Sequence, residues 1–230
     1  MDLMMRRREM LKIAGGSAPS INDYVTNGII LWYDGIQNTP NGHDSTSQYW
    51  YDLSGNDVHY AYSSSNIISS KYCDIDGTAG QWVSSASSNV SDNINGHVAF
   101  VEIVIDPDET GETTQCLFPY GNVVGTTWIK TNAIGFQGNS NSKSLSLSSG
   151  VHYYNSELYK DGTIQTNANV SSSWSTAYFT LSGARRIFSY SNATNYAAKC
   201  NIYAFRVYNR VLTASEIQKN WLTDKARFGI

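Results

Sequence analysis

Charged side chains are scarce in this chain of 230 residues. They make up 15% of it, against about a quarter in an ordinary soluble protein, and the net charge of −3 leaves no excess of cations. Outside the N-terminal residues the only adjacent arginines are Arg185 and Arg186, and no basic stripe accompanies them. Because a nucleic-acid partner requires many cations against its phosphates, the composition argues against such a partner.

Long apolar runs and paired cysteines are lacking as well. No apolar run approaches the roughly 20 residues of a membrane-spanning helix, so we expect no membrane insertion. The three cysteines, Cys73, Cys116 and Cys200, are far apart, and none has the paired spacing of a metal site. We expect them to behave as small buried apolar residues. A Cys73–Cys200 or a Cys116–Cys200 disulfide is left open.

Serine, asparagine, threonine and glycine replace the missing charge, together with 16 tyrosines and 6 tryptophans. Small polar residues and glycine tolerate the backbone of turns, and aromatic residues suit the half-buried surface of a sheet. Short apolar runs recur with turn signals about every 8–12 residues, as in sandwiches and barrels. The strongest strand pattern covers residues 97–105, where incomplete alternation indicates that both faces are covered. The sequence therefore predicts an all-β protein.

Two local patterns predict specific structures. Asp161-Gly162 predicts a two-residue hairpin, because this pair supplies the positive φ that such turns need. Thr213, followed three residues later by Glu216, predicts the capping box of a helix. We expect one short helix from residue 213 to about residue 224, laid against the sheets.

The N-terminal residues 1–27 differ from the rest of the chain. The run Arg6-Arg7-Arg8-Glu9-Met10-Leu11-Lys12 resembles a twin-arginine export motif, but the apolar stretch after it is short and rich in glycine, which is not the pattern of an effective signal. We expect instead a basic segment that docks on a partner, followed by a flexible linker. One folded domain is expected over residues 28–230.

Four segments resemble, in the same order, the laminin-G-like jelly rolls of the concanavalin-A-like lectin and glucanase superfamily. The segments are Trp32 with the turn Asp52-Leu53-Ser54-Gly55-Asn56, residues 72–77 with Trp82-Val83, residues 158–162, and residues 202–217. The last of these matches the closing strand, the Tyr-Asn-Arg-x-Leu turn and the Glu-Ile helix of the family. The resemblance covers about residues 28–221 and implies an all-β, two-sheet antiparallel jelly-roll sandwich with one short C-terminal helix. It names no ligand, because a fold does not give a function.

Carboxylates do not follow the pattern of a glycosidase of this fold. Such an enzyme is expected to have Glu-x-Asp-x-(x)-Glu along one inner strand, because a retaining mechanism places two carboxyl groups about 5–5.5 Å apart. Glu102 and Asp106 share the strongest predicted strand, but no third carboxylate has the required spacing. The histidines are also scattered, at positions 43, 59, 97 and 152. We therefore expect a protein that is not an enzyme, and a glycoside hydrolase is the least supported class.

Exposed aromatic rings beside amides and hydroxyls suit sugars, whose flat apolar faces are ringed by hydroxyl groups. The candidates for ligand binding, near predicted strand ends in Ser- and Asn-rich segments, are Trp128, Tyr153, Tyr154, Trp174 and Tyr190. We assign five other aromatic residues to the core: Trp32, Trp82, Phe100, Phe205 and Trp221.

The sequence thus favours a binding module that recognises a cell-surface glycan or polysaccharide. The resemblance is to domains of phage and bacterial surface proteins, so we expect the protein in a virion or outside the cell. The alternative is a purely structural virion subunit of a tail, a fibre or a capsid surface. Its partners would be virion proteins or a second copy of the chain, and the basic N-terminal segment supports it.

Calcium is the one cofactor that the resemblance suggests, because many laminin-G-like domains hold an ion at the rim of the sandwich. This cation prefers oxygen ligands, and the candidates are Asp34, Asp52, Asp74 and Asp108. None of the four lies in a loop with a recognisable ligand spacing.

Overall fold

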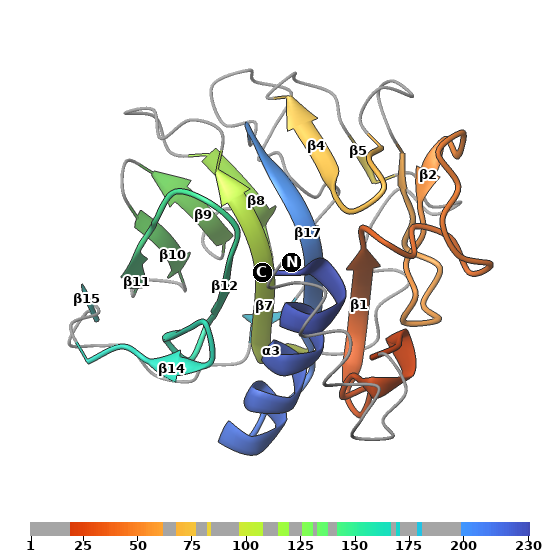
Figure 1. Cartoon of the computed structure of the whole chain (residues 1–230). Helices are drawn as coiled ribbons and strands as arrows, with labels where there is room; N and C mark the ends of the chain where they lie inside the picture. The colour runs from red at the N-terminus through yellow and green to blue at the C-terminus, as the bar shows by residue number, and fades with distance from the viewer. Residues whose placement is uncertain are drawn as a thin grey trace, which may run out of the picture.

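Two antiparallel sheets, one of seven strands and one of five, face each other in the computed structural model of the protein (Figure 1). The structure describes residues 19–61, 68–76, 82–83, 97–107, 115–119, 126–130, 133–137, 142–166, 169–170, 179–180 and 199–230. The predicted all-β sandwich with a C-terminal helix is confirmed.

The seven-stranded sheet has the order β1-β17-β7-β12-β13-β14, and β4 also pairs with β17. Its strands are β1 (Ile29–Asp34), β4 (Cys73–Asp76), β7 (Phe100–Pro107), β12 (His152–Asn155), β13 (Tyr159–Lys160), β14 (Thr163–Ile164) and β17 (Lys199–Tyr208). The predicted Asp161-Gly162 hairpin joins β13 to β14, and both of its turn residues have positive φ. Cys73 and Cys200 lie buried on the paired strands β4 and β17, and the disulfide between them is not formed.

The five-stranded sheet has the order β15-β11-β10-β9-β8. Its strands are β8 (Gln115–Pro119), β9 (Thr126–Lys130), β10 (Ala133–Gln137), β11 (Ser142–Ser146) and β15 (Asn169–Val170). Two smaller sheets complete the described strands: β6 (His97–Val98) with β16 (Phe179–Thr180), and β2 (Tyr49–Trp50) with β3 (Tyr60–Ala61) and β5 (Trp82–Val83).

The central strand β7 is buried on both faces, which explains its incomplete alternation. Val101, Ile103 and Ile105 face the core between the two sheets. Phe100 and Val104 face the opposite side, where they pack in a second core beneath the C-terminal helix. Four of the five aromatic residues predicted to be internal are buried, and the side chain of the fifth, Trp82, lies outside the described part of the chain.

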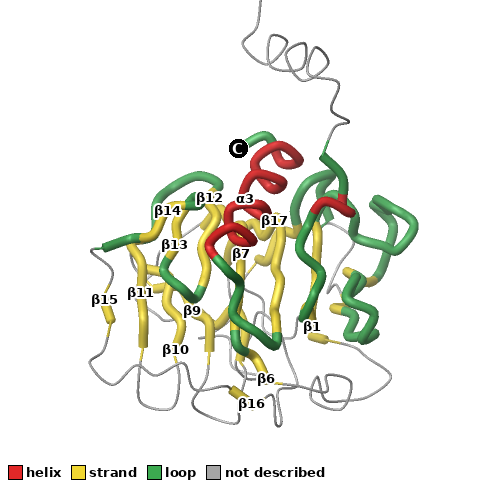
Figure 2. Tube along the Cα trace, turned by 90° about the horizontal axis from the view of Figure 1, so that it is seen from below, coloured by secondary structure: helices red, strands yellow, loops and turns green. Residues whose placement is uncertain are grey.

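The helix α3 (Ala214–Phe228) lies across the seven-stranded sheet, as Figure 2 shows. The predicted capping box is confirmed: Glu216 N–H donates to Thr213 Oγ1, and Thr213 N–H donates to the Glu216 carboxylate. The helix is about one turn longer than predicted and ends at Gly229, whose φ of 75° is left-handed. The extra turn is held by packing of Phe228, which is 2% exposed.

Residues before position 28, where the folded domain is expected to begin, also pack against α3. The short 3-10 helix η1 (Ile21–Asp23) contacts α3, and Tyr24 and Val25 are buried. We call residues 19–27 the N-terminal strap. The strap belongs to the folded unit, so the flexible linker cannot extend to residue 27.

The charge of Glu216 makes a pH-dependent contribution to stability. Hydrogen bonds from Arg210 and from the Thr213 amide lower the pKa of Glu216 from 4.5 to about 2. A depressed folded-state pKa stabilises the protein above the unfolded value, and this contribution is lost as the pH falls through the folded value. We predict that Glu216→Gln lowers the free energy of unfolding most above about pH 4.5 and that its effect fades towards pH 2.

Urea denaturation of the native protein and of Glu216→Gln from pH 7 to pH 2 measures the difference in their free energies of unfolding. The titration of groups that the two proteins share cancels in this difference. A difference that stays constant over this range would mean that the Glu216 charge has no role at the helix start.

Candidate functional site

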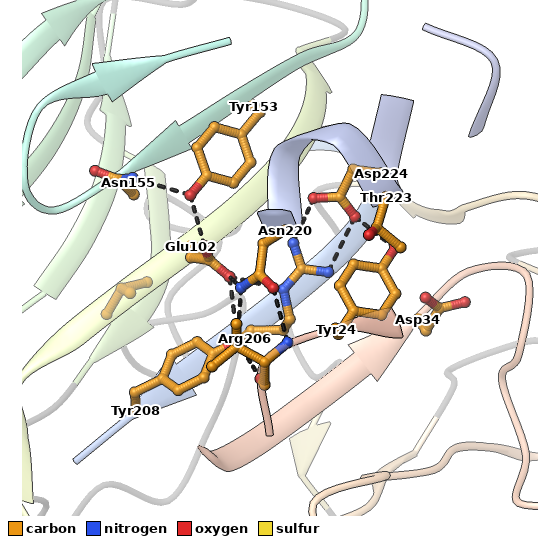
Figure 3. Close-up of polar contacts among 12 residues, drawn as sticks. Tyr24, Asp34, Glu102, Tyr153, Asn155, Arg206, Tyr208, Asn220, Thr223 and Asp224 are labelled. Carbon is orange, nitrogen blue, oxygen red and sulfur yellow. Dashed lines mark hydrogen bonds and ion pairs between the residues drawn. The ribbon is translucent and has the colours of Figure 1, made fainter. Parts of the chain in front are cut away.

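A buried polar cluster lies between the seven-stranded sheet and α3 (Figure 3). Arg206 from β17 is its centre, and its Nε donates to Glu102 Oε2 of β7 at 2.8 Å. Its two terminal nitrogens donate to the two oxygens of Asp224 of α3 at 3.0 and 2.5 Å. All three side chains are 0% exposed. The guanidinium therefore joins the sheet to the helix.

The strand register explains why Glu102 and Arg206 meet. They are direct cross-strand partners in β7 and β17, and neighbouring side chains on one face of a sheet interact. Glu102 also accepts hydrogen bonds from the hydroxyl of Tyr153 at 2.5 Å and from Nδ2 of Asn220 at 2.9 Å. These donors satisfy a carboxylate that burial would otherwise disfavour.

The N-terminal strap completes the cluster from the other side. Tyr24 donates through its hydroxyl to Asp224 Oδ1 at 2.7 Å, and the Val25 amide donates to Asn220 Oδ1 at 2.9 Å. A second ion pair continues the network, since both terminal nitrogens of Arg227 donate to Asp34 at 2.5 and 3.1 Å. Strap, sheet and helix are thus held by the same set of charges.

Burial and charge set the ionisation of this cluster. Burial raises the pKa of Asp224, and the charge of Arg206 opposes that rise. Burial also disfavours the charge on Arg206. The negative charges of Asp224 and Glu102 outweigh this effect of burial, so the pKa of Arg206 lies above its ordinary value. Arg206 is therefore charged. Because solvent does not reach Glu102 or Asp224, the geometry of the cluster suits holding α3 in place.

Two of the residues predicted to bind a ligand lie in the interior. Tyr153 and Tyr154 belong to β12 and are both 0% exposed. The Tyr153 hydroxyl is bound within the polar cluster, and the Tyr154 hydroxyl accepts from the Ser148 amide at 3.0 Å. This placement corrects the prediction of surface rings at a strand end. The sequence analysis missed β12 because polar residues flank its short apolar core.

The other predicted ligand-binding residues are described in part or not at all. Trp128 lies in β9, where its backbone pairs with Gly135 of β10, and its side chain is outside the described part of the structure. Trp174 and Tyr190 lie outside the described residues. Their roles stay predictions.

The predicted calcium ligands Asp34 and Asp52 bind protein groups. Asp34 holds Arg227 and accepts from the amides of Ile36 and Gln37. Asp74 is partly buried in β4, and Asp108 lies outside the described residues. Within the described ranges, no three His, Cys, Asp or Glu side chains form a group that could hold a metal ion.

Asp52 has a clear structural role at the open edge of β1. Its Oδ1 accepts from the Trp32 amide at 2.9 Å, and the Leu53 amide donates to the Trp32 carbonyl at 2.8 Å. Asn56 Nδ2 donates to the Ile30 carbonyl at 2.9 Å. An unpaired edge strand is a template for unwanted pairing, so this turn covers an edge that would otherwise be exposed.

The outer face of the small β2-β3-β5 sheet carries a set of partly exposed aromatic side chains. Trp50 and Tyr60 are direct partners in β2 and β3 and point into the core. Because side chains alternate between the two faces of a strand, Tyr49, Tyr51 and His59 belong to the outer face, and each is partly exposed. We call these three residues the aromatic face. The backbone of residue 82 in β5 pairs with Ala61 of β3.

The aromatic face has a fixed geometry. The rings of Tyr51 and His59 lie 4.5 Å apart at 50°, and those of Tyr49 and Tyr51 lie 6.3 Å apart at 71°. The Asp52 amide donates to His59 Nδ1 at 3.2 Å. The neutral imidazole therefore carries its hydrogen on Nε2, which lies 4.0 Å from Asp57 Oδ1.

Asp57 adds an exposed carboxylate beside these rings. Its side chain is 87% exposed, and its φ of 56° is unusual for a residue other than glycine. Ring faces, an N–H donor and a carboxylate acceptor thus lie together at the surface. In the sequence His59 is one of four scattered histidines, and no motif singles out Tyr49 or Tyr51. The sequence marks this segment only by three successive aromatic residues at positions 49–51.

No protein-family model matches the sequence, and no curated protein matches it. Solved structures do match. A mutant Trypanosoma rangeli sialidase with trans-sialidase activity is 14% identical, with a TM-score of 0.54 over 97% of this chain and 39% of that chain. Botulinum neurotoxin type C, whose cell entry depends on interaction with two ganglioside molecules, is 12% identical, with a TM-score of 0.54 over 89% of this chain and 53% of that chain.

The binding domain of botulinum neurotoxin serotype D is 12% identical, with a TM-score of 0.55 over 86% of this chain and 51% of that chain. At such low identity the likeness shows a common β-sandwich fold. The chain spans between 39% and 53% of the length of these neighbours. Among the described residues, no helix is long and apolar enough to cross a membrane.

The polar cluster predicts that two arginines, Arg206 and Arg210, contribute very differently to the free energy of unfolding. Replacing Arg206 by Met leaves Glu102 and Asp224 buried without their cation, and breaking such a buried pair destabilises a protein by about 3–5 kcal/mol. Arg210 pairs with Glu216 near the surface, where side chains are 29% and 28% exposed, so Arg210→Met should reduce stability by about 1 kcal/mol or less. Urea denaturation of both variants at pH 7 measures the two values. Equal losses would refute the central role of Arg206.

Proposed function

We propose that this protein is a non-catalytic module that binds a cell-surface glycan or polysaccharide through its aromatic face. The observation that carries the proposal is the arrangement of Tyr49, Tyr51 and His59 on the outer face of the small sheet, next to the exposed Asp57. A sugar ring stacks its apolar face on an aromatic ring and hydrogen-bonds through its hydroxyls. The Nε2 hydrogen of His59 and the carboxylate of Asp57 supply one donor and one acceptor for these hydroxyls.

The fold and its neighbours support this assignment. One neighbour is a sialidase solved in complex with sialic acid, and another is a toxin whose cell entry depends on gangliosides. Similar sandwiches thus occur in proteins that interact with glycans. A non-catalytic role is supported by the buried polar cluster, in which Glu102 and Asp224 are fully buried and bind Arg206. We place the module in a phage virion or on a bacterial surface, in line with the family resemblance.

A structural virion subunit is the second candidate, and the N-terminal strap favours it. Tyr24, Val25 and Asn27 of the strap are hydrogen-bonded to α3, Tyr208 and Arg210. The basic residues that precede the strap would therefore leave the domain at a fixed point, as an anchoring segment requires. The two candidates are compatible, since an adhesin performs both roles.

The aromatic face predicts a specific loss of binding. In a glycan array followed by calorimetric titration of the tightest ligand, Tyr51→Ala should weaken binding about tenfold, equivalent to about 1.4 kcal/mol. Tyr51→Phe keeps the ring and should bind nearly as the native protein does. Tyr159→Ala, on β13 at the other side of the seven-stranded sheet, is the matched control and should not affect affinity. If Tyr51→Ala binds as tightly as the native protein, the aromatic face is not the site.

The same titration in EDTA tests the calcium hypothesis. Calcium takes about 6–8 oxygen ligands. The described residues hold no group of three His, Cys, Asp or Glu side chains for a metal, and the aromatic face offers one exposed carboxylate, on Asp57. We therefore expect the affinity for glycan to be unchanged by the chelator. An affinity that EDTA lowers and added calcium restores would establish that binding requires calcium.

A further inference from the structure

Aspartates are the strongly charged side chains in the segment that carries the aromatic face. Residues 36–61 contain Asp44, Asp52 and Asp57 and neither lysine nor arginine. Asp44 and Asp57 are exposed, whereas Asp52 is buried in its turn. Residues 36–61 therefore bring exposed carboxylates to the surface, with that of Asp57 beside the aromatic face, and contribute no lysine or arginine.

Two basic side chains that could compensate are bound elsewhere. Lys71, the next basic residue along the chain, donates through Nζ to the Phe228 carbonyl at 3.1 Å. Arg227 is held by Asp34. Anionic groups are recognised mainly by Arg and Lys, and neither cation is available to the aromatic face.

We infer that the glycan bound at the aromatic face is neutral, built of hexose or N-acetylhexosamine units without a carboxylate or sulfate. The inference rests on the proposed function and narrows its ligand class. The hydroxyls of a neutral sugar both accept from the His59 Nε2 hydrogen and donate to Asp57. A sialic acid would instead place its carboxylate near the carboxylate of Asp57, and this repulsion at about 4 Å in water corresponds to roughly fivefold weaker binding.

The experiment compares one neutral oligosaccharide with the same oligosaccharide carrying a terminal sialic acid, titrated into the full chain at low salt. We expect the neutral form to bind at least about fivefold more tightly. Salt screens exposed charges, so the ratio should shrink at high ionic strength. Asp57→Asn should also shrink the ratio, because asparagine keeps an acceptor oxygen, tolerates the left-handed backbone and removes the charge.

The outcomes separate this inference from the proposed function. If the sialylated form binds more tightly and Tyr51→Ala abolishes this binding, the inference of a neutral ligand is wrong, whereas glycan binding at the aromatic face is supported. Binding of neither form, nor of any glycan on an array, by protein with a native circular dichroism spectrum overturns both. A dimer in sedimentation that Tyr51→Ala dissociates assigns the face to a second copy of the chain and also overturns both.

Discussion

The guanidinium of Arg206 connects parts of the chain that lie far apart in the sequence. It bonds to Glu102 in the middle of the sheet and to Asp224 in the helix, and its Cζ lies 4.5 Å from the ring centre of Tyr24 in the strap. The helix has few apolar residues of its own facing the sheet, chiefly Ile217, Trp221 and Phe228. Its position therefore depends on charges that must be paired once they are buried. With Arg206 in place, the second face of the seven-stranded sheet is closed.

This closure decides where a ligand could bind. One face of the seven-stranded sheet packs against the five-stranded sheet, and the other face is covered by α3 and the strap. The carboxylates of Glu102 and Asp224 are buried and bind Arg206. At the aromatic face, rings, a donor and an acceptor lie together at the surface. Its backbone is held from beneath by Trp50, whose Nε1 donates to the Asp34 carbonyl at 2.8 Å.

The sequence predicts the parts of the fold that local chemistry determines. The hairpin at Asp161-Gly162 and the capping box at Thr213 depend on residues a few positions apart, and both are confirmed. The double burial of β7 also follows from its own composition. The order of the strands and the exact helix end depend on contacts between distant residues. The resemblance to a known family implies the two-sheet architecture, but no local pattern predicts the strand order or the last turn of the helix.

The candidate site is harder to predict, for the same reason. Glu102 and Arg206 are 104 positions apart, and no local pattern shows that they pair. Polar residues flank Tyr153 in the sequence, which suggests a surface position. Its hydroxyl donates to Glu102, and this hydrogen bond permits burial of a residue that often keeps its polar end in water. Tyr51 and His59 meet because two very short strands, β2 and β3, set the register. Strands of two residues carry almost no periodic signal.

The most direct test of glycan binding at the aromatic face is a titration followed by NMR of the histidine ring protons and carbons. The account predicts saturable shifts of the His59 resonances as a neutral oligosaccharide is added. His152, whose Nδ1 lies 2.8 Å from Asp161 near the opposite side of the seven-stranded sheet, should not shift. A glycan that binds while the His59 resonances stay unchanged would contradict the account.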